Sequence, residues 1–119
     1  MRLPWLSKLQ YLVTGTSALR ELTVRVEDGD ALAQHLLAGI YYSRKDIPKQ
    51  MEQAIYWWRK SAEQGFADAQ FNLALMYYQG CGVQHDETEA LRWLRFAAEQ
   101  GKAEAQSLLG AWYLNGKSG

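Results

Sequence analysis

One pattern of residues returns along this chain at a fixed spacing of 36 positions. The clearest copy is the segment 65–101, which reads GFADAQFNLALMYYQGCGVQHDETEALRWLRFAAEQG. The residues that recur in this register include Gly65 and Gly101, Leu73 and Leu109, Tyr77 and Tyr113, and, one spacing earlier, Leu37 and Tyr41. A period between about 20 and 50 residues is typical of supersecondary units that stack on one another. The repeat therefore predicts a chain of similar units that share a core.

Each unit is expected to contain two helices, because its apolar residues recur at helical spacing. No stretch alternates apolar and polar residues for long enough to predict a strand. The first helices of the units are predicted over 30–43, 67–79 and 102–115, and the second helices over 48–64 and from Asp86 to Gly101. Glycines at 65 and 101 are predicted to end the second helices, and Asp86 with Glu89 predicts a capping box. The fold class predicted is all-α.

The repeat also predicts where the units begin and end. The first unit covers 29–64, the second covers 65–100, and 101–119 holds half a repeat, with one helix and a tail. Residues 1–28 carry apolar positions over 3–13 and 18–28 that follow the pattern only loosely. They are predicted to form an atypical N-terminal pair of capping helices, since a terminal repeat has no outer neighbour.

Charge and cysteine content argue against several classes of protein. Lysine plus arginine and aspartate plus glutamate number 13 each, so the formal net charge is zero. Nucleic acid is therefore not expected as a partner, because phosphate binding needs a basic surface. No apolar run approaches the roughly 20 residues that span a bilayer, so no membrane insertion is expected. The lone Cys81 fits a reducing compartment and predicts a cytoplasmic location, with a periplasmic one as the alternative if a leader was removed.

The residues that usually carry chemistry are too scattered to predict an active site. The histidines His35 and His85 are fifty positions apart, and Cys81 has no partner thiol. A zinc site needs three or four such ligands, and a nucleophile needs an adjacent base. We therefore expect no enzyme, no metal and no cofactor.

Three short motifs resemble those of Sel1-like repeats, which are relatives of the tetratricopeptide repeats. The motifs are LGAWY at 109–113, GCGV at 80–83 and AAEQG at 97–101. The first unit departs from the pattern, because SRKDIP at 43–48 replaces the glycine loop. The resemblance implies a right-handed α/α solenoid of about two and a half helix-turn-helix repeats. It also implies a non-enzymatic scaffold that binds protein partners.

In tetratricopeptide-like solenoids the first helices line the concave face, and this pattern can be carried over to the present chain. The positions expected to face inward are Leu32, His35, Gly39, Tyr42, Asp68, Phe71, Leu75, Tyr78, Gln79, Glu104, Ser107, Ala111, Leu114 and Asn115. The candidate partner-binding residues among them are His35, Tyr42, Phe71, Leu75, Tyr78, Gln79 and Leu114. Such a groove would bind a peptide or a partner domain. The alternative for some of these side chains is packing between the first helices of adjacent units.

Two further hypotheses concern the partner and the C-terminal end. An inhibitor or immunity-type protein that covers the active site of an enzyme would use the same concave surface. Trp112 stands at a position held by Ile40 and Met76 in the earlier units, and no second helix follows to cover it. A large uncovered aromatic side chain predicts either a homodimer contact or a docking edge, unless the tail folds back over it.

Overall fold

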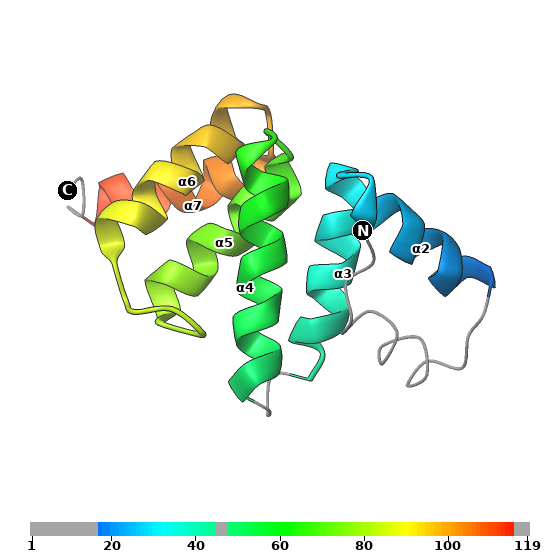
Figure 1. Ribbon diagram of the computed structural model, residues 1–119. Helices are drawn as coiled ribbons and strands as arrows, with labels where there is room; N and C mark the ends of the chain where they lie inside the picture. Colours follow the sequence, from blue (N-terminus) through cyan, green and yellow to red (C-terminus); the bar gives the residue numbers. More distant parts are fainter. Residues whose placement is uncertain (1–16, 45–47, 116–119) are drawn as a thin grey trace.

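The computed structural model describes residues 17–44 and 48–115, and these residues form six helices and no strand (Figure 1). The helices are α2 (Ser17–Glu27), α3 (Ala31–Tyr42), α4 (Pro48–Glu63), α5 (Ala67–Gln79), α6 (Glu87–Glu99) and α7 (Ala103–Leu114). Their bounds lie close to those that the repeat predicts, and the all-α fold class is confirmed. The helix predicted over 3–13 lies outside the described residues.

The helices form a row in which each one packs against the helix before it and the helix after it. Within the units, α3 packs on α4 and α5 packs on α6; between the units, α4 packs on α5 and α6 packs on α7. Figure 1 shows α2 at one end of the row and α6 with α7 at the other. The extents of 48, 27 and 21 Å describe an elongated body, as expected for stacked units that contact only their neighbours.

The ends of successive helix pairs have one geometry, which depends on glycine. Gly29, Gly65 and Gly101 have φ angles of +85°, +92° and +90°, a left-handed conformation that side chains with a Cβ rarely adopt. In the second unit the Gly65 amide donates to the Ala62 carbonyl at 2.9 Å, and the next amide reaches back to the Ser61 carbonyl at 3.3 Å. The predicted glycine stops are therefore present, and the chain reverses direction in the same way after each pair.

The start of α6 shows only half of the predicted capping box. The Asp86 side chain accepts a hydrogen bond from the Glu89 amide at 3.1 Å, as expected of a helix cap. The reciprocal bond is absent, because the Asp86 amide donates to the Tyr77 carbonyl at 3.0 Å. The Glu89 carboxylate instead binds the Arg92 guanidinium at 3.0 and 3.2 Å. The prediction of a full capping box was wrong in this second half.

A ladder of glutamines ties neighbouring units together. Gln34 and Gln70 hold the same repeat position, and both are buried. The Gln64 side chain donates to the Gln34 side chain at 2.8 Å, and the Gln100 side chain donates to the Gln70 side chain at 2.7 Å. Gln70 also donates to the backbone carbonyl of Ala62, in the preceding unit, at 3.1 Å. The buried Gln70 amide thus has two partners, one in its own unit and one in the preceding unit, as buried polar groups require.

We expect the glutamine hydrogen bonds to contribute more to the free energy of unfolding in the middle of the row than at its end. Gln70→Ala should lower the free energy of unfolding by about 1–3 kcal/mol, because it leaves the Gln100 side chain without its acceptor and removes one of the two donors to the Ala62 carbonyl. Gln106 is the matched control, since it makes the equivalent bond to the Ala98 carbonyl at 3.0 Å but is exposed. Gln106→Ala should cost less than about 0.5 kcal/mol. Urea denaturation of both variants measures the difference, and equal costs would refute a role for burial in the ladder.

Candidate functional site

Two adjoining hollows lie between α5 and α7, the first helices of the second and third units. The shallow one has a volume of about 510 Å³ and is lined by Phe71, Ala103, Glu104, Ser107, Leu108 and Ala111. The deeper one has a volume of about 190 Å³ and is lined by Ala74, Leu75, Tyr78, Ala90, Leu94, Leu108, Ala111, Trp112 and Asn115. Because Leu108 and Ala111 line both, the hollows lie side by side along α7. We call the two together the α5–α7 groove, and the deeper one the cavity.

Helical spacing brings the side chains of the groove together. Phe71, Leu75 and Tyr78 are separated by four and three positions, so they lie on one face of α5. Leu108 and Ala111 are separated by three positions and lie on one face of α7. The structure therefore brings together three of the seven candidate residues. The prediction that they bind a partner is not tested by their placement.

The remaining candidates lie elsewhere. His35 and Tyr42 are half-buried on α3 and pack against side chains outside α3. His35 Nδ1 accepts a hydrogen bond from Trp58 Nε1 at 3.1 Å, and the centre of the Tyr42 ring lies 5.4 Å from that of Trp58. These two residues thus pack against α4, the second helix of their own unit. Gln79 and Leu114 are exposed and line neither hollow.

Trp112 is buried, contrary to the expectation that nothing covers it. Only 7% of the residue is exposed, and its ring centre lies 5.3 Å from that of Tyr78. The side chain turns back toward α5 and the cavity instead of outward from the end of the row. The exposed apolar side chains at that end are Tyr113 and Leu114, and 89% of Leu114 is exposed. A docking or dimer contact at this end remains a prediction, and it would have to use these residues.

A charged cluster borders the shallow hollow beside Phe71. The Lys102 ammonium lies 2.8 Å from the Asp68 carboxylate and 3.4 Å from the Glu104 carboxylate. It also lies 5.7 Å from the centre of the Phe71 ring, within the range of a cation–π interaction. The hydrogen bond to Asp68, and then the charges of both carboxylates, raise the pKa of Lys102. Its own backbone amide and then Lys102 lower the pKa of Glu104, so Lys102 and Glu104 stay ionised at neutral pH.

Sequence reasoning did not single out Lys102 or Leu108 as parts of this surface. Lys102 follows the glycine stop directly, so it reads as a surface residue of a turn. Leu108 lies four positions after Glu104 and three before Ala111, both of which were expected to face inward. Helical spacing could therefore have identified Leu108. Nothing in the sequence indicates that Lys102 reaches Phe71.

The described residues 17–44 and 48–115 contain no group of three or more histidine, cysteine, aspartate or glutamate side chains that could hold a metal ion. In the same part of the chain, no helix combines the length and the apolar character needed to cross a membrane. Cys81 is a half-buried free thiol.

Comparison with known proteins identifies the repeat. The model of the Sel1 repeat matches residues 31–66, 67–102 and 103–119. The chain belongs to the Sel1 repeat family. The three Sel1 matches begin at the first residues of α3, α5 and α7. Sel1 repeat proteins generally mediate protein–protein interactions, and their fold is typically non-catalytic.

Two solved structures of Sel1 repeat proteins resemble this chain. A Sel1 repeat protein from Oxalobacter formigenes is 35% identical, with a TM-score of 0.77, over 93% of this chain and 46% of that one. The protein c5321, a protective antigen present in uropathogenic Escherichia coli strains, is 40% identical, with a TM-score of 0.75. That match covers 86% of this chain and 22% of the antigen. The chain therefore spans less than half the length of either protein. No curated protein matches the sequence.

We expect His35 to make the stability of the repeat depend on pH. Burial is the main cause that lowers the pKa of His35 below 6.5; Lys102 acts in the same direction, and Asp68 opposes them. The unfolded chain therefore takes up a proton more readily than the folded chain. The contribution of His35 is fully present above about pH 6.5 and is lost as the pH falls toward the lower folded pKa.

Thermal unfolding of the wild type and of His35→Gln between pH 7.5 and 5 tests this prediction. The wild-type melting temperature should fall as the pH decreases through this range, and His35→Gln should show a shallower fall because it cannot take up the proton. His85→Gln serves as the control, since His85 is exposed on a loop, and it should keep the contribution of His35. Parallel curves for the wild type and His35→Gln would contradict the prediction.

Proposed function

We propose that the α5–α7 groove binds a peptide or a surface segment of a partner protein, and that the chain acts as a non-enzymatic adaptor. The observation that carries the proposal is the pair of adjoining hollows lined mainly by apolar side chains. Tyr78 and Leu108 are both exposed there, beside half-buried Phe71 and Leu75. An exposed apolar surface with a polar border is typical of a protein-interaction site.

The groove offers two kinds of contact. Its apolar side chains can bury an aliphatic or aromatic anchor of the partner, which is where most binding free energy of an interface arises. The Lys102, Asp68 and Glu104 cluster on its border presents both signs of charge. Border charges contribute more to orientation and association rate than to affinity. A short peptide that places one apolar anchor beside a polar stretch would suit this arrangement.

The Sel1 family supports the general role, since its members generally mediate protein–protein interactions. The inhibitor or immunity-type role is the alternative for the same groove. An activity assay of the captured partner, with and without the chain, separates the two roles. The cytoplasmic location and the homodimer remain predictions.

Leu108→Glu tests the groove directly. We expect peptides selected from a displayed library on the wild-type chain to bind this variant at least about tenfold more weakly, because the substitution places a charge between the two hollows. Fluorescence anisotropy with the selected peptides measures the change. Leu108 is 37% exposed, so the helical content, followed by circular dichroism, should not change. The double variant Phe71→Ala/Tyr78→Ala is expected to abolish binding.

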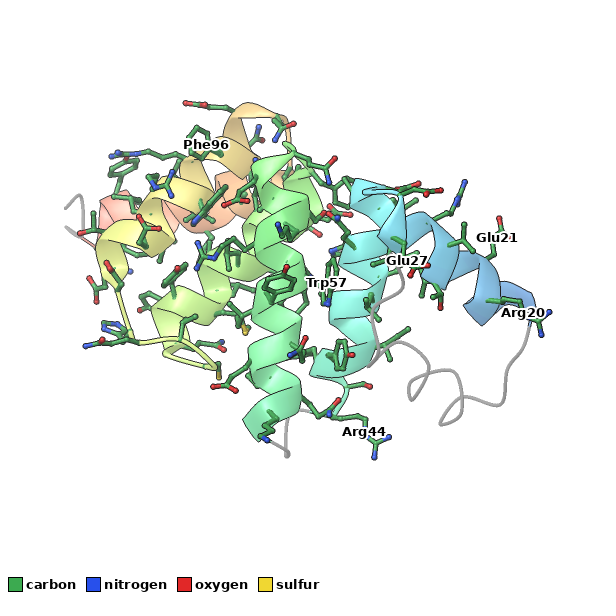
Figure 2. All side chains as sticks on the ribbon, in the orientation of Figure 1. Arg20, Glu21, Glu27, Arg44, Trp57 and Phe96 are labelled. Atoms are coloured by element: carbon green, nitrogen blue, oxygen red, sulfur yellow. The ribbon has the colours of Figure 1, made fainter. Side chains whose placement is uncertain are left out.

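Phe96→Glu is the matched control. Phe96 is 41% exposed and projects from the outer side of α6 (Figure 2), and it lines neither hollow. This variant makes the same change from an exposed apolar residue to glutamate, and it should bind the peptides as the wild type does. If Leu108→Glu kept full affinity, or if both variants lost it equally, the groove would not be the binding surface.

A further inference from the structure

We infer that the cavity between α5, α6 and α7 is a socket for one aromatic ring, the indole of a tryptophan side chain on the bound partner. The inference deepens the proposed function, because the ring would be the anchor of that partner. The cavity itself can be tested without any partner, since free indole carries the same ring. The argument comes from a comparison of the two interfaces between successive units of this chain.

At the first interface the chain supplies its own indole. Leu94, which lines the cavity, has Trp58 as its counterpart 36 positions earlier. Trp58 is 3% exposed and contacts His35 through its ring nitrogen and Tyr42 through its ring. The counterparts of these two partners are Phe71 and Tyr78, both of which line the α5–α7 groove. The groove therefore repeats two of the residues around the Trp58 indole and has a leucine at the position of Trp58, while Trp112 packs against Tyr78.

The residues around the second interface change in size in both directions: Leu75 replaces Gly39 and takes up space, whereas two other changes leave space. Leu94 replaces Trp58, and Ala111 replaces Leu75, so two walls of the cavity are shorter than at the first interface. Trp112 replaces Met76 and forms another wall. Leu94 is completely buried. These substitutions remove the counterpart of the Trp58 ring, and the cavity lies beside the Trp112 ring.

The size and the lining of the cavity fit an aromatic ring. An apolar cavity of about 150 Å³ in another protein stays free of water and binds benzene. The present cavity is about 190 Å³ and is lined mainly by alanine, leucine, tyrosine and tryptophan. A ring that enters it would contact Tyr78 and Trp112. Pairs of aromatic rings in contact stabilise an interface beyond the effect of the area that they bury.

One polar group in the lining also lacks a partner. The Trp112 Nε1 atom is buried, and no hydrogen-bond acceptor reaches it among the described residues. A buried donor without an acceptor costs free energy. The atom is buried away from the open space of the cavity, so it does not by itself identify the occupant.

Titration of the ¹⁵N-labelled chain with indole tests the inference. The five tryptophans give separate ring N–H signals, and Trp112→Phe assigns the signal of Trp112. We expect this signal to shift saturably, with a dissociation constant on the order of 1 mM for a ligand of this size. Leu94→Trp, which restores the residue of the first interface, should weaken indole binding at least about tenfold.

Phe96→Trp is the matched control, because it adds a tryptophan to the exposed face of the same helix; it should bind indole as the wild type does. If Leu94→Trp does not fold, Ala111→Leu restores the other wall and should weaken binding in the same direction. The inference is overturned if the Trp112 signal shows no saturable shift, or if the filled variants bind indole as tightly as the wild type.

The selected peptides, indole and the Leu108→Glu variant together separate this inference from the proposed function. Peptides that bind through the groove but do not compete with indole would overturn the socket and leave the proposed function standing. In a second outcome, indole binds at Trp112 but Leu108→Glu does not weaken peptide binding. This outcome would support the ring preference of the cavity and overturn the groove as the partner surface. Replacement of tryptophan by alanine in a selected peptide should weaken its binding at least about tenfold.

Discussion

The structure depends on the contact between the second helix of one unit and the first helix of the next. A single helix pair buries only one apolar stripe on each helix, which is too little to hold the pair together in water. The contact of α4 with α5, and that of α6 with α7, cover the remaining stripes. The bond from Gln70 to the Ala62 carbonyl crosses the interface between α4 and α5, and the bonds between Gln64 and Gln34 and between Gln100 and Gln70 lie within their units. Stability in such a row is approximately a sum of unit and interface terms.

The same contact explains why residues of α7 are less buried than their counterparts in α3 and α5. Leu37 and Leu73 are fully buried because a second helix of their own unit covers them, whereas their counterpart Leu109 is only half-buried. Tyr113 is exposed, although its counterpart Tyr41 is buried. Its hydroxyl accepts hydrogen bonds from the Arg95 guanidinium at 3.0 and 2.7 Å. The inner side of α7 is thus covered by α6, and no other helix of residues 17–44 and 48–115 covers its outer side.

Variation on a repeated frame accounts for the candidate site. The backbone arrangement of the second interface follows that of the first, since α3, α5 and α7 begin, and α4 and α6 end, at equivalent repeat positions with equivalent glycine stops. What differs is the size of side chains at equivalent positions, above all Leu94 in place of Trp58. A repeat can gain a cavity in this way without a change of fold. The Lys102 cluster adds charge to the border of the same groove.

Much of the fold could be predicted from the period of 36 and from the glycines, because both determine local structure. The grouping of Phe71, Leu75 and Tyr78 was also predictable, since it follows from helical spacing. The burial of Trp112 was not, because it depends on which way the ring turns and on the space beside Tyr78. The bond between Trp58 and His35 joins residues 23 positions apart, and no local pattern indicates it. The missing half of the capping box depends on the Tyr77 carbonyl, which comes from a different helix.

Native-state amide hydrogen exchange measures whether neighbouring units hold one another together. The account predicts that amides in α4 and α5 exchange only through unfolding of the whole row, because each of these helices is packed on both sides. Amides in α7 should exchange through a smaller opening, with a free energy at least about 1 kcal/mol lower, because α7 packs on one neighbour. Equal protection of α7 and α4, or exchange of the α3–α4 pair independently of the α5–α6 pair, would contradict it.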